Sequence, residues 1–118
     1  MESISLQLAR TFLGKHVNVK MDRPLGSKHL KHGFLYEANY GFIEGTKSAD
    51  GAELDAYFLG VNDPMQKAEG TCIAIVHRLN DDDDKLVVAP KELELSDEQI
   101  KVAVAFQEKY FKSVIIRK

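Results

Sequence analysis

Hydrophobic and polar positions alternate over several short segments of the chain, as they do in half-buried strands. The clearest alternation covers residues 17–21. Residues 33–42 are rich in aromatic side chains and β-like, although Asn39 and Gly41 suggest bends. Runs of β-branched and aliphatic residues predict further strands over 54–61, 71–79, 85–89 and 114–116.

Two other segments have the spacing of amphipathic helices. In residues 3–13 apolar side chains recur every four residues, and Gly14 is placed to end the helix. Ser96 is a good N-cap for a second helix, and Gln99 completes a capping box. A mainly apolar stripe follows at helical spacing: Ile100, Ala103, Val104, Gln107 and Phe111. Many short strands and one long C-terminal helix predict a mainly β fold, a small barrel with flanking helices.

Length and composition indicate an ordinary globular protein. The 118 residues, of which 44% are hydrophobic, suit one domain over 1–118. No apolar run approaches the ~20 residues that span a bilayer, and the N-terminus does not resemble a signal peptide. Cys72, the single cysteine, lies in an apolar run and is expected to be a buried, inert thiol. We therefore expect a cytoplasmic protein with no membrane partner.

The net charge of −2 conceals a strong separation of charge along the chain. Residues 15–32 carry five Lys or Arg and three His, with Asp22 as the only acid, whereas residues 81–84 are four consecutive Asp. If the fold brings these segments together, cations would hold an anion and carboxylates would hold a metal. The alternative is two separately solvated charged faces.

Two acidic segments are candidates for binding metal. Asp50 and Asp55 flank a turn that leads into a strand, an arrangement that can direct two carboxylates at one hard cation such as Mg²⁺. The four adjacent Asp repel one another unless a cation is present, and alternation places Asp83 and Lys85 on one side of an extended chain. If neither segment binds metal, the first is only an acidic turn and the second is a solvated hairpin tip.

Tyrosines and lysines form a third group of candidates. Tyr36, Tyr40 and Tyr110 carry hydroxyls that can donate to phosphate oxygens, and Lys112 supplies a charge near Tyr110. These tyrosines are also explained as packing residues of the core or its rim.

These segments occur together and in the same order as the motifs of the soluble family I inorganic pyrophosphatases, which the chain resembles. The resemblance covers about residues 17–112. It rests on Val19–Lys28, Tyr36-Glu-Ala-Asn-Tyr-Gly, Asp50-Gly-Ala-Glu-Leu-Asp, Asp83-Asp-Lys-Leu-Val and Phe106-Gln-Glu-Lys-Tyr. It implies an OB-like five-stranded barrel with a C-terminal helix, and Mg²⁺-dependent hydrolysis of pyrophosphate to phosphate.

The resemblance also implies roles for individual residues. Metal would be bound by Asp50, Asp55 and Asp83, with Asp81 or Asp82. Lys85 would act in catalysis beside Asp55. Phosphates would be bound by Lys28, Tyr36, Tyr40, Lys85 and Tyr110, with Lys112 offset by one position from the family's lysine. Lys31 or Arg23 would replace a family arginine.

Two departures from the family pattern affect the expected chemistry. Ala52 stands where the family has a carboxylate that orients or deprotonates the attacking water, so we hypothesise that Glu53 partly substitutes. The stretch between Lys28 and Tyr36 is also short, and it contains His29 and His32, which we interpret as loop histidines rather than ligands. A more open pocket would admit another diphosphate, such as a nucleotide.

Two other functions compete with pyrophosphate hydrolysis. If the site lacks the carboxylate that deprotonates the attacking water, the protein would be a non-catalytic phosphate- or nucleotide-binding module. An OB-fold nucleic-acid binder is disfavoured, because no stacking aromatics interleave the basic residues 15–32 and the net charge is slightly negative. We thus expect no nucleic-acid partner. Family members assemble variously, so a homo-oligomer is an open alternative.

Overall fold

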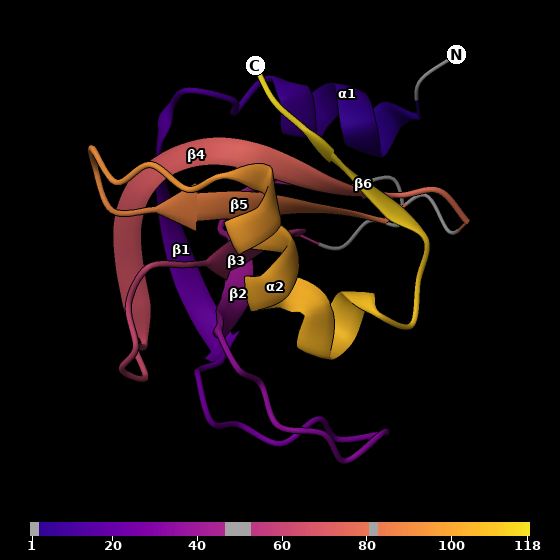
Figure 1. Cartoon of the computed structure of the whole chain (residues 1–118). Coiled ribbons are helices and arrows are strands. Elements are labelled where there is room, and N and C mark those ends of the chain that lie inside the picture. Colours follow the sequence, from indigo (N-terminus) through magenta and orange to yellow (C-terminus); the bar gives the residue numbers. More distant parts are fainter. Residues whose placement is uncertain (1–2, 47–52, 81–82) are drawn as a thin grey trace.

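The computed structural model describes residues 3–46, 53–80 and 83–118. In chain order the elements are α1 (Ile4–Arg10), β1 (His16–Arg23), β2 (Asn39–Ile43), β3 (Leu54–Phe58), β4 (Lys67–Arg78), β5 (Asp84–Ala89), α2 (Asp97–Glu108) and β6 (Ser113–Ile116). Figure 1 shows the strands wrapped into a strongly curved sheet.

The sheet closes into a barrel. Its strand order is β1-β2-β3-β5-β4-β6, and β1 also pairs with β4, which joins five strands into a ring and leaves β6 as an added strand on β4. Of these pairings only β3 with β5 is parallel. The long, bent β4 makes closure possible, since its first half pairs with β1 and its second half with β6. The predicted five-stranded barrel is confirmed.

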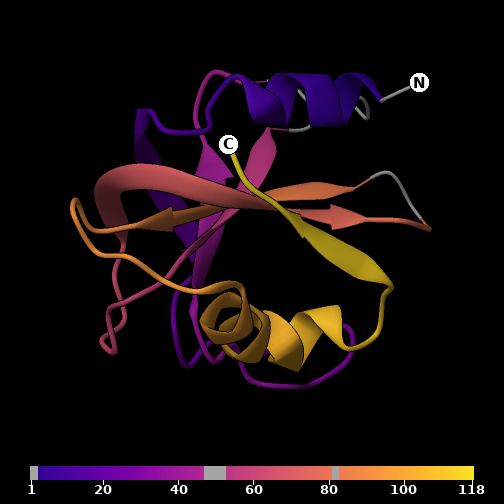
Figure 2. The same ribbon diagram turned by 45° about the horizontal axis from the view of Figure 1, so that its top comes forward.

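Strand alternation creates two separate cores. Leu86 and Val88 of β5 belong to the cluster that fills the barrel, whereas Val87 between them belongs to a second cluster on the outer face. Helix α1 adds Leu6 and Ala9 to the first cluster. Figure 2 shows α1 and α2 on opposite sides of the barrel, and α2 packs on the second cluster. Every residue of β5 is consequently buried.

Helix α2 forms as its sequence predicts. Ser96 Oγ accepts from the Gln99 N–H and Gln99 Oε1 from the Ser96 N–H, which completes the capping box. Ile100 and Val104 are buried, so the apolar stripe faces the barrel. No helix in the described ranges is long and apolar enough to cross a membrane. Cys72 is buried as predicted.

Several predicted boundaries were wrong. Residues 33–38 are not a strand, because their backbone pairs irregularly with residues 26–29, including Tyr36 N–H to Ser27 O at 2.7 Å, and only β2 joins the sheet. Conversely, β4 begins at Lys67, four residues before the predicted start at residue 71. That extension has no clear apolar alternation and is fixed by backbone pairing with β1. Helix α1 ends at Arg10, before the predicted residue 13.

Candidate active site

Asp55 and Lys85 form the centre of the site because their strands lie side by side. They are opposite each other in the parallel register of β3 and β5. Lys85 Nζ donates to Asp55 Oδ2 at 2.7 Å. The Lys85 side chain is 4% exposed and that of Asp55 is 36% exposed. The ammonium is therefore buried, and it is paired with a carboxylate that solvent can reach. Burial makes such a pair more strongly coupled than a surface ion pair.

Asp83 converges on the same ammonium. Its Oδ2 accepts from Lys85 Nζ at 2.9 Å. The contact agrees with the predicted alternation, which puts Asp83 and Lys85 on one side of the chain. The next carboxylate, Asp84, points elsewhere: its Oδ1 lies 2.5 Å from His77 Nδ1, and the residue is buried. Within the described part of the acidic run, alternation therefore assigns Asp83 to the site and excludes Asp84.

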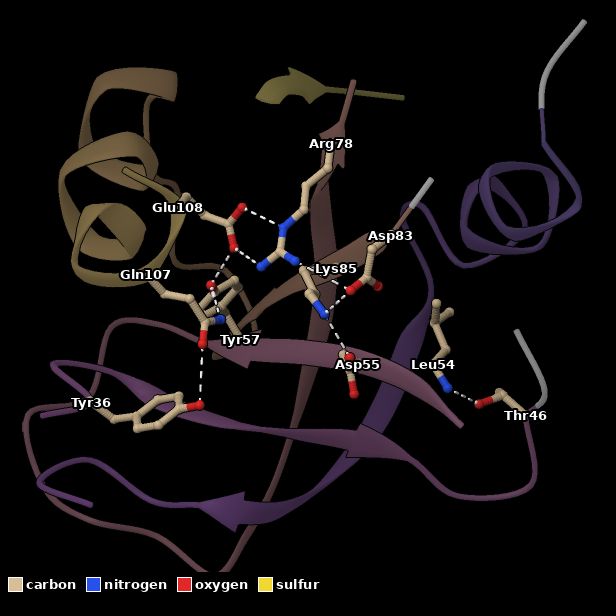
Figure 3. A network of polar contacts seen from close by, with 10 residues as sticks. All are labelled: Tyr36, Thr46, Leu54, Asp55, Tyr57, Arg78, Asp83, Lys85, Gln107 and Glu108. Atoms are coloured by element: carbon tan, nitrogen blue, oxygen red, sulfur yellow. Dashed lines mark hydrogen bonds and ion pairs between the residues drawn. The ribbon is translucent and has the colours of Figure 1, made fainter. Parts of the chain in front are cut away.

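A buried network links this centre to helix α2 (Figure 3). The Arg78 guanidinium donates twice to the Glu108 carboxylate, at 2.9 and 2.8 Å, and its Nη1 lies 3.3 Å from Asp83 Oδ2. Glu108 Oε2 also accepts from the Tyr57 hydroxyl at 2.6 Å. The Arg78 Cζ atom lies over the Phe111 ring, 3.7 Å from the ring centroid. Arg78 is thus a fixed second cation next to Asp83.

The tyrosines of the site are kept protonated. Burial, together with the charge of Asp55, raises the pKa of Tyr40 well above its usual value. Burial and the Glu108 carboxylate do the same to the pKa of Tyr57. Tyr36 also has a raised pKa through burial, and its hydroxyl donates to Gln107 Oε1 at 3.1 Å. At neutral pH these phenols are hydrogen-bond donors, although the hydroxyls of Tyr36 and Tyr57 already donate to Gln107 and Glu108.

A pocket of about 500 Å³ opens next to Lys85. Tyr36, Tyr40 and Tyr110 line it, as does Arg78. The other predicted phosphate ligands, Lys28, Lys31 and Lys112, are exposed and are not among the lining residues. The structure therefore brings Lys85 and the tyrosines together and leaves these three lysines exposed, outside the lining of the pocket.

The predicted metal ligands are only partly described. Asp50, Asp81 and Asp82 lie outside the described residues, as does Ala52. Glu53, the hypothetical base, accepts a hydrogen bond from the Gly45 N–H through Oε2 at 2.9 Å and so supports the turn after β2. Thr46 Oγ1 accepts from the Leu54 N–H at 2.8 Å, which ties the end of β2 to the start of β3.

Asp55 and Asp83 have the chemistry that a hard divalent cation requires. Both direct a carboxylate oxygen at the same ammonium, which shows that the two side chains can share a cation. Oxygen donors of this kind suit Mg²⁺. Among residues 3–46, 53–80 and 83–118 there is no group of three or more His, Cys, Asp or Glu that could hold a metal ion. These two Asp would need further ligands.

Sequence reasoning did not identify four members of the network: Tyr57, Arg78, Gln107 and Glu108. Their sequence separations, such as 30 residues between Arg78 and Glu108, carry no local signal. Asp22 was also missed. Burial raises its pKa against the opposing influence of Arg23, and it interacts electrostatically with Asp55 and Lys85. Its isolation as the one acid of a basic segment was the available signal.

Known proteins share this fold. An inorganic pyrophosphatase from Ehrlichia chaffeensis aligns with a TM-score of 0.67 at 16% identity, over 86% of this chain and 84% of that one. One from Helicobacter pylori gives 0.66 at 18%, over 87% and 85%. One from Neisseria gonorrhoeae gives 0.64 at 25%, over 82% and 74%. No curated protein sequence matches the chain.

The sequence itself carries the family pattern as well. The inorganic pyrophosphatase family model matches residues 14–114, which include every strand of the barrel, helix α2 and the Asp55–Lys85 pair. With most of the chain matched and the barrel shared, this protein belongs to the inorganic pyrophosphatase family.

Proposed function

We propose that this protein hydrolyses inorganic pyrophosphate to two phosphate ions with Mg²⁺ as cofactor. The observation that carries the proposal is the convergence of Asp55 and Asp83 on the Lys85 ammonium, on a fold of the pyrophosphatase family. Carboxylates that share a cation, beside a buried lysine and protonated tyrosines, are suited to binding a metal-bound diphosphate.

The charges of the site support a need for metal. In the described network two cations, Lys85 and Arg78, face three carboxylates: Asp55, Asp83 and Glu108. A diphosphate anion approaching this excess of negative charge would be repelled. Asp55 and Asp83, together with Asp50 and Asp81 or Asp82, would hold Mg²⁺, which supplies an activated water and neutralises phosphoryl oxygens when bound.

The protein's own groups would then orient the substrate. Lys85 lies in the pocket wall, 5.6 Å from the Tyr40 ring centroid, where its charge can polarise a phosphate oxygen. Tyr40 keeps its proton, because burial and Asp55 raise its pKa, and can donate to the same anion. Arg78 adds a guanidinium to the pocket wall, fixed by Glu108.

The test is phosphate release from pyrophosphate, with and without Mg²⁺, by the wild type and two Asp→Asn variants. Asp55→Asn is expected to lower Mg²⁺-dependent turnover by about 10²-fold or more, since a ligand and a charge are lost. Asp63→Asn is the matched control, because Asp63 is exposed in the β3–β4 connection. Equal activity of Asp55→Asn and wild type would sink the proposal.

Ala52 favours one second candidate function. It stands at the family's water-orienting carboxylate, so the chain would bind Mg²⁺ and pyrophosphate without turning it over. Calorimetric binding of Mg²⁺-pyrophosphate combined with no phosphate release above background would support this binding module. Measurable Mg²⁺-dependent release would exclude it.

A further inference from the structure

Two kinds of side chain dominate the lining of the pocket beside Lys85. The cations Lys85 and Arg78 form what we call the Lys85–Arg78 wall. Four rings that contact one another form what we call the ring wall: His29, His32, Phe34 and Tyr110. The rest of the lining is Tyr36, Tyr40, Gln107 and Phe111. Pyrophosphate is wholly polar and has no surface that would benefit from the ring wall. About 500 Å³ is also within the range of pockets that hold larger organic ligands.

The rings are arranged in near-parallel layers. The centroids of His29 and His32 are 4.9 Å apart and their planes differ by 29°. His32 and Tyr110 are 6.4 Å apart at 26°, and Phe34 and Tyr110 are 5.8 Å apart at 27°. Planar rings in this order offer a further planar ring a surface on which to stack.

The ring wall is accessible at its outer end. Tyr110 is 58% exposed, and His32 is also exposed. Two turns hold the wall in place. His29 Nδ1 accepts from the Lys31 and His32 N–H groups at 3.1 and 3.0 Å, and the His29 N–H donates to Phe34 O at 2.7 Å. The loop of residues 29–34 is thus fixed against Tyr110, just after α2. The rings of His32 and Tyr110 remain exposed to solvent.

We propose that this pocket takes a nucleoside diphosphate, with the phosphates at the Lys85–Arg78 wall and the base stacked at His32 and Tyr110. This inference rests on the proposed function, because the same centre would cleave the diphosphate. In this step the oxygen of a water molecule bonds to the terminal phosphorus while the bond between that phosphorus and the bridging oxygen breaks. The bridging oxygen keeps the electron pair and leaves on the nucleoside monophosphate. One proton of the water passes to solvent, and the other stays on the phosphate that is formed.

The electrostatics of the ring wall suit a base. Desolvation lowers the pKa of His29, and the electrostatic influence of His32, Arg23 and Lys31 acts in the same direction. The imidazole is therefore neutral at neutral pH and stacks as an uncharged ring. Lys31 is exposed in the same loop and is not among the residues that line the pocket.

Binding is measured by calorimetry with Mg²⁺ and two ligands that cannot be hydrolysed at the bridge. The α,β-methylene analogue of adenosine diphosphate carries the base, and the methyl ester of methylenediphosphonate matches its charge without a ring. The base-bearing ligand is expected to bind on the order of 5- to 150-fold more tightly, as is typical of one stacked base. Equal Kd values would overturn the inference.

His32→Ala locates the base. It removes one exposed ring and no described side-chain hydrogen bond, since only the His32 backbone N–H is used in the turn. The variant should lose most of the advantage of the base-bearing ligand and keep the Kd of the methyl ester. Leu30→Ala, at an 85% exposed position of the same loop, is the control. An undiminished advantage in His32→Ala would also refute the proposed site.

Phosphate release separates this inference from the proposed function. If pyrophosphate is hydrolysed but the base gives no gain in binding, the inference fails and the pyrophosphatase function stands. If the base-bearing ligand binds with the His32-dependent gain while pyrophosphate is not hydrolysed, the nucleotide site stands and the proposed hydrolysis fails. A thermal melt of each variant checks that the fold is retained.

Discussion

At the scale of single residues, the Lys85 ammonium organises the site. It is almost fully buried, yet two carboxylates and a tyrosine ring face it. Both Asp55 and Asp83 are partly exposed, at 36% and 43% of their side chains, so each presents an oxygen to solvent as well as to Lys85. A metal-bound anion can reach them without unfolding the strands that carry them.

Glu53 is the residue whose role most needs a direct test. Glu53→Gln keeps an oxygen that can accept from the Gly45 N–H, so the turn should be preserved. If Glu53 serves as the base in place of the missing carboxylate, turnover of pyrophosphate should fall about 10²- to 10⁴-fold. Steady-state kinetics and a thermal melt are the measurements. Unchanged kcat would show that Glu53 only supports the turn.

Ionisation of the Cys72 thiol should lower the free energy of unfolding at alkaline pH. Burial raises its pKa from 9.0 to about 11 in the fold. Because the folded pKa is raised, the thiol's contribution is complete below pH 9 and is lost as the pH rises through 11. The loss amounts to roughly 2–3 kcal/mol.

Urea unfolding at pH 8 and pH 11 measures this effect. The drop in unfolding free energy should be smaller in Cys72→Ala than in wild type, since the variant has no thiol to ionise. Comparing the two chains removes the contribution of the buried tyrosines, which titrate in both. An identical drop would contradict the assignment.

At the scale of elements, the network joins α2 to the barrel through its C-terminal end. Gln107 and Glu108 lie in the last turn of α2 and contact Tyr36, Tyr57 and Arg78, which come from three separate segments. The helix thereby fixes the guanidinium next to Asp83. The position of α2 and the electrostatics of the site are consequently coupled.

Glu108→Gln tests this coupling. It leaves the buried Arg78 with a neutral partner, and the expected cost is roughly 3 kcal/mol of unfolding free energy. The exposed Glu94, just before α2, gives the control variant Glu94→Gln, which should change stability by less than about 0.5 kcal/mol. Denaturant unfolding followed by circular dichroism decides. Equal stability of the two variants would mean that Arg78 does not depend on Glu108.

At the scale of the whole molecule, closure of the barrel depends on β4 passing close to its neighbours. A Cβ at Gly70 would lie 2.2 Å from the backbone oxygen of Ala89 in β5. Gly70 also pairs with Val17 of β1, so the residue lies where β4 contacts both strands. No side chain fits there unless the strands move apart.

Gly70→Ala should therefore destabilise the protein by about 3 kcal/mol or more. Chemical denaturation is the measurement. Lys67→Ala, at an exposed position earlier in β4, is the control and should be close to neutral. A Gly70→Ala protein as stable as wild type would show that the barrel tolerates a wider gap between β4 and β5.

The sequence by itself determined most elements, because periodicity and capping are local properties. The Ser96–Gln99 box and the apolar stripe of α2 predicted that helix, and alternation predicted that Asp83 and Lys85 share a side. The many short strands predicted a small barrel, and the family resemblance implied that it has five strands. Only the tertiary structure decided that residues 33–38 leave the sheet and that Lys67 begins β4, since backbone pairing with distant segments fixes both.

Some residues of the candidate site were likewise predictable from the sequence, and others were found only in the tertiary structure. Asp55, Lys85 and the tyrosines could be read from local patterns, whereas the Arg78–Glu108 pair and the ring wall could not. Arg78 and Glu108 are 30 residues apart, and the ring wall is completed by contacts of Tyr110 with His32 and Phe34, which are still farther from it in the sequence. A one-dimensional pattern records what a residue is and which side of its element it faces. Which residue meets it there is settled only when the barrel closes and α2 packs on its outer face.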